Sequence, residues 1–203
     1  MNHTQSTPEW QPLLTWLTQS VRNYHDKPTS HSGSEWRRTR AFLRRGNSQS
    51  TEHYAYPFIL PLLPADASPT TRTVALRLAA LVAEFDAVPH IDSQETGFRS
   101  LGQWCNLISR KLAPEQETLD PRHPDAVASR LVSLHTQNVD EAITTIRRIA
   151  ALAGNTKDTP PLPVYDLFRI FFRWGNGFTE SSQRVRRSVL QNYYSGFSTS
   201  ASS

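Results

Sequence analysis

The chain contains the stretch Trp36-Arg37-Arg38-Thr39-Arg40-Ala41-Phe42-Leu43-Arg44-Arg45, in which apolar residues recur with the period of an α-helix. At 100° per residue, Trp36, Phe42 and Leu43 fall on one side and all five arginines on the other. We therefore predict an amphipathic helix that begins near Ser34, with Gly46 at its C-terminal cap. Such a helix buries its apolar side and presents a strongly basic face.

The segments on either side show the same helical periodicity. Helices are predicted over residues 9–24, 71–86, 100–112, 125–134, 140–153, 165–174 and 179–194. Prolines break residues 56–69 into short pieces, because proline removes a backbone donor and disfavours helix at the preceding residue. No segment alternates convincingly with the strand period of two, so the sequence predicts an all-α fold.

The 203 residues permit one domain or two small ones. We expect two small helical bundles in one chain: an N-terminal bundle over residues 1–90, which carries the Arg-rich helix, and a C-terminal bundle over residues 91–197. A loop is expected at residues 91–99. Residues 198–203 are all Ser, Thr or Ala and are expected to form a flexible tail.

Composition limits the class of protein. A single cysteine, Cys105, permits no intrachain disulfide and agrees with a reducing compartment. The longest apolar stretch, Tyr56 to Leu63, is far shorter than the roughly 20 residues that span a bilayer. Met1 to Glu9 carries no charged-then-apolar signal pattern. We therefore expect a cytoplasmic protein with no membrane association.

No pattern of catalytic or cofactor-binding residues is present. The sequence lacks a nucleophile elbow, a glycine-rich phosphate loop and a paired-histidine zinc motif. The best metal candidate, residues 120–125, is typical of a surface turn in which Asp125 caps a helix. Cys105 neighbours Trp104 and is expected to be buried rather than reactive. We expect no enzymatic activity, no cofactor and no metal.

The basic residues are almost all arginine. Of 22 Lys and Arg only three are Lys. Most of the cationic side chains are therefore planar guanidinium groups, whose geometry suits phosphate or carboxylate. No acid lies between Trp36 and Thr51 or after Glu180, so the clusters at 37–45 and 184–187 need distant carboxylates, an acidic partner protein or nucleic-acid phosphates. Without a sheet of stacked aromatics or a clear helix-turn-helix, binding to the backbone without base readout fits best.

The order of these segments resembles the small subunit, the CasB family, of the type I-E CRISPR Cascade surveillance complex. The resemblance covers most of the chain and rests on the order and spacing of short motifs. These are an early helix with a Trp, Leu43-Arg44-Arg45, Ser100-Leu101-Gly102, Arg130 to Leu134, Ile146-Arg147-Arg148-Ile149, Leu167 to Trp174, and Arg186-Arg187 before Tyr193-Tyr194.

The resemblance implies an all-α, non-catalytic subunit whose partners are the CasA large subunit, the CasC backbone, the guide-RNA ribonucleoprotein and a second copy of itself. Members of the family hold the displaced non-target DNA strand, which stabilises the R-loop in antiviral defence. The resemblance places candidate phosphate contacts at Arg44, Arg45, Arg99, Arg130, Arg147, Arg148, Arg186 and Arg187. The charge argument alone adds Arg37, Arg38 and Arg40.

Two other functions stay open at this point. The chain could be a purely structural bridge whose arginines bind acidic surfaces of neighbouring subunits, or a free-standing helical DNA-binding regulator. Arginine segments that crosslink only to protein would favour the bridge. A preferred duplex site in a random-sequence selection would favour the regulator.

Overall fold

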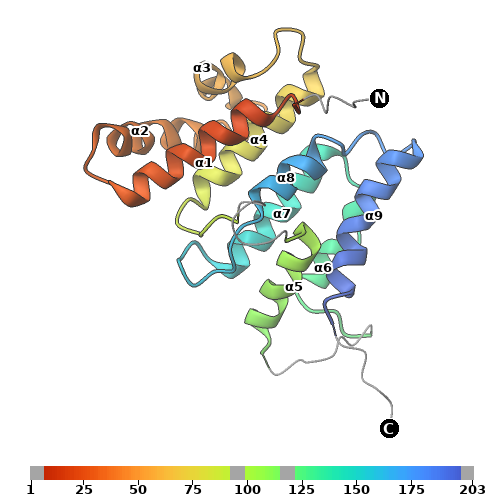
Figure 1. The fold of residues 1–203 in the computed structure, drawn as a ribbon. Helices are drawn as coiled ribbons and strands as arrows, with labels where there is room; N and C mark the ends of the chain where they lie inside the picture. The colour runs from red at the N-terminus through yellow and green to blue at the C-terminus, as the bar shows by residue number, and fades with distance from the viewer. Residues whose placement is uncertain (1–6, 92–98, 115–121, 198–203) are drawn as a thin grey trace, which may run out of the picture. The chain divides into compact units, whose positions relative to one another are not determined.

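The computed structural model describes residues 7–91, 99–114 and 122–197, and helices dominate all three ranges (Figure 1). The α-helices are α1 (Gln11–Asp26), α2 (His31–Arg45), α3 (Tyr56–Ile59), α4 (Pro69–Glu84), α5 (Leu101–Leu112), α6 (Ala128–Leu131), α7 (Val139–Ala153), α8 (Val164–Phe171) and α9 (Glu180–Tyr194). Three 3-10 helices are η1 (Glu52–Tyr54), η2 (Leu60–Leu62) and η3 (Leu134–Thr136). Within the described ranges, β pairing is limited to one isolated bridge between His90 and Leu162. The all-α prediction is confirmed.

The chain divides into two compact units, Met1–Glu84 and Phe85–Ser203. The division follows the last residue of α4. The two bundles expected over residues 1–90 and 91–197 stay a prediction. The expected tail at 198–203, and residues 92–98 of the expected loop, lie outside the described residues.

In the first unit, α2 packs against both α1 and α4. Leu13 and Leu17 of α1, and Trp36 and Leu43 of α2, are at most 2% exposed. The rings of Trp16 and Trp36 meet edge to face, with their centroids 6.3 Å apart. Residues 74–83 of α4 are all buried, and the alanines among them allow close helix packing. The apolar side of the Arg-rich helix is thus the side that enters the core.

In the second unit, α5 and α9 form the most extensive helix pair (Figure 1). Gly102 makes this close approach possible, because a Cβ at this position would lie 2.2 Å from the carbonyl oxygen of Val189. The indole N–H groups of Trp104 and Trp174 donate to the carbonyl oxygens of Pro160 and Gln137 at 2.9 and 3.0 Å. These buried rings therefore pack in the core without an unpaired donor.

The tryptophans and the single cysteine are buried or half-buried. Trp10, like the three tryptophans at 36, 104 and 174, is buried, and Trp16 is half-buried. Four of the five tryptophans therefore lie in the core. Cys105 is fully buried, and burial raises the pKa of its thiol well above the usual value. A buried, protonated thiol is a poor nucleophile.

Several helix ends differ from the sequence-based expectation. Helix α2 begins three residues before Ser34, because the Ser30 hydroxyl accepts a hydrogen bond from the Gly33 N–H at 3.1 Å. The helix predicted over 125–134 is wrong in extent. Asp125 Oδ1 accepts the N–H groups of Val127 and Ala128, both at 2.7 Å, and only the single turn α6 follows before η3. The helix predicted to reach Trp174 ends at Phe171.

Neither membrane spans nor metal clusters are found in the part of the chain that the structure describes. There, no helix is both long and apolar enough to cross a membrane. No group of three or more His, Cys, Asp or Glu side chains in this part could hold a metal ion. Asp120 and Pro121 of the metal candidate lie outside the described residues.

Candidate nucleic-acid interface

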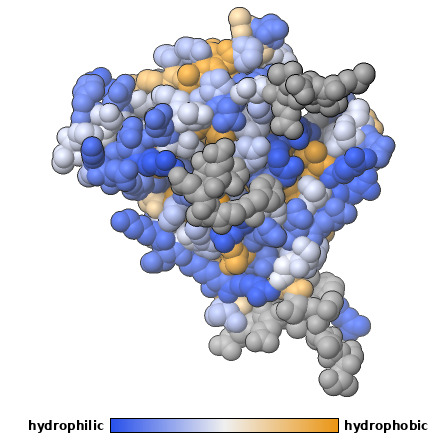
Figure 2. Space-filling view, in the orientation of Figure 1, coloured by the Kyte–Doolittle hydropathy of each residue, from blue (hydrophilic) through white to orange (hydrophobic). Residues whose placement is uncertain are grey.

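Four arginines of α2 form an exposed stripe along the helix, which we call the basic stripe: Arg37, Arg38, Arg44 and Arg45. All four are exposed, whereas Trp36, Thr39 and Leu43 on the opposite side are buried. Arg38, Arg44 and Arg45 follow Arg37 by one, seven and eight residues. This spacing keeps the four side chains on one face over about 12 Å of helix. The surface over α2 is largely hydrophilic in the view of Figure 2. This face combines high positive charge with the absence of any acidic residue between positions 36 and 51.

Arg40 departs from the predicted face. Its side chain is half-buried, and its guanidinium lies 5.8 Å from the centroid of the Tyr24 ring of α1. The sequence placed all five arginines together, but 300° of rotation from Arg37 brings Arg40 to the flank where α2 meets its neighbour. Arg40 therefore contributes to helix packing.

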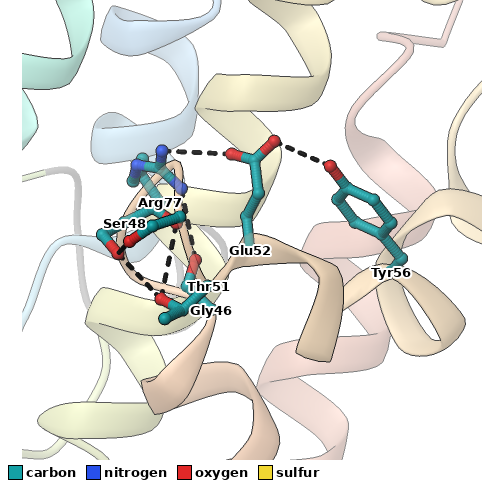
Figure 3. Close-up of polar contacts among 7 residues, drawn as sticks. Gly46, Ser48, Thr51, Glu52, Tyr56 and Arg77 are labelled. Carbon is teal, nitrogen blue, oxygen red and sulfur yellow. Dashed lines mark hydrogen bonds and ion pairs between the residues drawn. The ribbon is translucent and has the colours of Figure 1, made fainter.

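A partly buried ion pair between Arg77 and Glu52 lies at the C-terminal end of α2 (Figure 3). Arg77 of α4, whose side chain is 3% exposed, donates to the carbonyl oxygen of Gly46 at 3.2 Å and to Glu52 Oε2 at 3.1 Å. Glu52 also accepts the Tyr56 hydroxyl at 2.8 Å, and this hydrogen bond raises the pKa of Tyr56. These contacts hold the end of α2 against α4 and so orient Arg44 and Arg45.

Two further features complete that end of the helix. Gly46 is the C-cap residue, as predicted, and a Cβ there would lie 2.6 Å from Cβ of Ala55. The Arg45 guanidinium lies 5.8 Å from the centroid of the Tyr54 ring. Sequence reasoning missed Arg77 and Glu52. The available signal was a lone arginine in the middle of an apolar run, which must find an acceptor when the run is buried.

The remaining predicted contacts lie in the second unit with varied exposure. Arg148 of α7 and Arg187 of α9 are exposed, whereas Arg130 and Arg147 are half-buried. The Arg130 guanidinium donates to the Ala126 carbonyl at 2.6 Å, and Arg187 donates to the backbone and side-chain oxygens of Gln183, both at 3.3 Å. Helix α6 packs on α7, so the structure brings Arg130 and the two α7 arginines onto neighbouring elements.

Arg186 does not lie on the surface. It is 5% exposed, and its guanidinium stacks on the Trp174 ring with 5.0 Å to the centroid. Its donors bind the carbonyl oxygens of Trp174, Gly175, His135 and Gln137 at distances of 2.8 to 3.1 Å. Burial lowers the pKa of this guanidinium from its usual value, although arginine stays charged in proteins. Its hydrogen bonds are used within the protein, and we leave it out of the proposed interface.

Arg99 immediately precedes the Ser100 cap of α5 and is half-buried. It lines a pocket that it shares with Arg110, an arginine that the sequence reasoning did not single out. The basic stripe lies in the first unit, and the candidates Arg99, Arg130, Arg147, Arg148 and Arg187 lie in the second.

The fold and the exposed arginines define the class of protein. It is an all-helical protein with an exposed arginine face and no metal cluster among its described residues. The family model described as CRISPR-associated protein Cse2 (CRISPR_cse2) matches residues 39–194. The chain belongs to this family, and the resemblance to CasB stated from the sequence is confirmed. A search of curated protein sequences returned no match.

Solved structures show the same fold at low sequence identity. TTHB189, a CRISPR-associated protein of the Cse2 family from Thermus thermophilus, aligns with a TM-score of 0.61 and 20% identity over 93% of this chain and 99% of its own. CasB from Thermus thermophilus gives 0.61 and 19% over the same shares. A chain of a CRISPR RNA-guided surveillance complex gives 0.57 and 18%, over 93% of this chain and 94% of its own.

Proposed function

We propose that the protein is a non-catalytic subunit of a CRISPR RNA-guided surveillance complex that binds nucleic acid without reading its sequence. In this role it holds the displaced non-target DNA strand and stabilises the R-loop in cytoplasmic antiviral defence. Its partners in the complex are the CasA large subunit, the CasC backbone with its guide RNA, and a second copy of itself. Family membership and a fold neighbour from such a complex support this assignment.

The basic stripe on α2 is the observation that carries the proposal. A guided complex obtains sequence recognition from base pairing, so its protein contacts to the displaced strand must be independent of sequence. Arginine forks that bind phosphate oxygens meet this requirement, because phosphates carry no sequence information. R-loop formation is nearly balanced in free energy, so a few such contacts shift the equilibrium.

The structural bridge is the strongest alternative, since an arginine face also complements an acidic protein surface. The regulator receives less support, because a fold neighbour belongs to a surveillance complex. Crosslinking separates the first two functions. In the assembled complex bound to target DNA, the residues of the basic stripe should crosslink to the non-target strand. Crosslinks from α2 to protein alone would establish the bridge instead.

Charge reversal provides the functional test. Replacing Arg44, Arg147 and Arg148 by Glu should weaken target binding by the assembled complex at moderate salt, while the subunit still assembles. The matched control is Arg184→Glu, which reverses an exposed arginine already paired with Glu180 at 2.6 Å. Unchanged target binding by the triple variant would refute these contacts.

A further inference from the structure

A pocket of about 380 Å³ lies within the second unit, between α5 and the segment that follows α9. Its lining residues are Arg99, Gln103, Asn106, Leu107, Arg110 and Gly196. Two of these are arginines and two are carboxamides, and none of the six is acidic. The wall therefore carries two positive charges, and the volume falls in the range of small-ligand sites.

Three contacts hold Arg110 in position. Its Nε donates to Asn106 Oδ1 at 3.1 Å, its Nη2 donates to the Gly196 carbonyl, and its guanidinium lies 5.7 Å from the Phe197 ring centroid. Asn106 is 4% exposed and donates to the Tyr193 carbonyl at 3.2 Å. A Cβ at Gly196 would lie 2.6 Å from Cγ of Asn106, so this close approach requires glycine. A guanidinium fixed in this way is preorganised for a ligand.

Arg99 supplies a donor without an acceptor. Its Nη1 is buried and has no hydrogen-bond partner among the residues that the structure describes. The backbone beside it is fixed, because Ser100 and Gln103 form a capping box at the start of α5. The acid that contacts this end of α5, Asp166, is already bound by the Leu101 N–H at 2.7 Å and by Arg169 at 2.6 Å. An acceptor stabilises a charged donor of this kind, and an anion in the pocket that Arg99 lines would supply one.

We propose that this pocket binds a phosphate group between Arg99 and Arg110, and that the phosphate belongs to an unpaired nucleotide of the bound strand. Two guanidinium groups match the several oxygens of a phosphate better than the two of a single carboxylate. An open pocket suits a nucleotide that is splayed out of a stack, whose base edge the exposed Gln103 side chain can meet. The assignment of the strand rests on the proposed function; the phosphate site itself does not.

Binding of a fluorescein-labelled oligo-dT to the full chain tests the strand assignment. Arg99→Ala and Arg110→Ala should each weaken binding about tenfold, which corresponds to about 1.4 kcal/mol. Each should also reduce the slope of log K against log salt concentration by about 0.7. Arg173→Ala, which removes the same charge from an exposed position of the same unit outside the pocket, should weaken binding less than twofold. Equal effects of the three variants would overturn the strand assignment.

Thermal unfolding with inorganic phosphate or thymidine monophosphate tests the pocket independently of any strand. Each should raise the Tm of the wild-type chain over chloride at equal ionic strength, and Arg99→Ala should abolish the rise. Arg99→Ala is the cleaner variant, because its Nη1 makes no hydrogen bond to any residue that the structure describes. No rise in the wild type, or an equal rise in the variant, would overturn the phosphate site.

The two assays also distinguish which proposal fails. Oligo-dT binding that depends on the basic stripe but not on Arg99 or Arg110 refutes the pocket's strand role and leaves the proposed function standing. Absence of oligo-dT binding at low salt refutes the proposed function, and the unfolding assay then decides the phosphate site alone. A rise in Tm with thymidine monophosphate, without any effect of the pocket variants on oligo-dT, assigns the site to free nucleotides and contradicts the strand assignment.

Discussion

The basic stripe of α2 and Arg186 of α9 use the same side chain in opposite ways. Arg37, Arg38, Arg44 and Arg45 are exposed on a face without acids, whereas Arg186 is 5% exposed and bound to four backbone carbonyls. Both occur in arginine-rich runs of similar composition. What decides whether an arginine is exposed or buried is its position relative to the buried stripe of its helix. The net charge of the surrounding segment does not decide it.

The sharpest way to test this difference is Arg186→Ala. The change removes the donor to the carbonyl oxygens of Gly175 and His135. The carbonyls of Gln137 and Trp174 also lose this donor but keep the Trp174 indole N–H and the Ser182 hydroxyl. Because unsatisfied buried polar groups cost about 1–3 kcal/mol each, we expect a loss of about 3 kcal/mol or more in the free energy of unfolding. Urea unfolding measures it.

Arg187→Ala is the matched control, since Arg187 is adjacent and exposed, and it donates to Gln183 one turn earlier. It should change the free energy of unfolding by no more than about 0.5 kcal/mol. Similar losses for the two variants would contradict the contrast between buried and exposed arginines.

Arg77→Ala should have the next largest effect, because it connects the core of the first unit to the basic stripe. It removes the donor to the Gly46 carbonyl and unpairs Glu52, which is 20% exposed and keeps some access to water. We expect a loss of about 2–3 kcal/mol in the free energy of unfolding. A double-mutant cycle with Glu52→Gln measures the coupling, and a coupling near zero would show that the ion pair does not fix the end of α2.

Arg184→Ala should have the smallest effect. The Arg184–Glu180 pair joins side chains that are 75% and 82% exposed, at 2.6 Å across one helical turn. Exposed pairs of this type contribute about 0.3–0.5 kcal/mol. Thermal unfolding should show almost no change, and a large loss would mean that burial is the wrong criterion for sorting the arginines.

The elements that could be predicted from the sequence are those with local signals. Helix α5 was expected from Ser100 to Leu112, and Ser100 with Gln103 forms its capping box. Helix α6 was expected to be longer, because the hydrogen bonds of Asp125 to the following N–H groups compete with a regular helix. Side-chain hydrogen bonds of this kind depend on geometry that periodicity does not report.

The interface was predicted in part for a similar reason. Helical rotation placed Arg37, Arg38, Arg44 and Arg45 on one face, and all four are exposed in the structure. The burial of Arg186 was missed, although Ser182, Arg186, Val189 and Tyr193 share the spacing of a buried stripe. This pattern is easily missed, because arginine is charged and is rarely counted among buried residues. Carbonyls from distant segments accept its hydrogen bonds, and no local rule predicts them.

The salt dependence of single-stranded DNA binding tests the central claim most directly. The wild-type chain should be compared with a quadruple variant in which Arg37, Arg38, Arg44 and Arg45 are Ala. If the basic stripe contacts phosphates, the quadruple variant should lower the slope of log K against log salt concentration by up to about 3, at roughly 0.7 for each lost contact. Its free energy of unfolding should change little, because the four side chains are exposed. Equal slopes for the two proteins would contradict the assignment of α2 as the nucleic-acid interface.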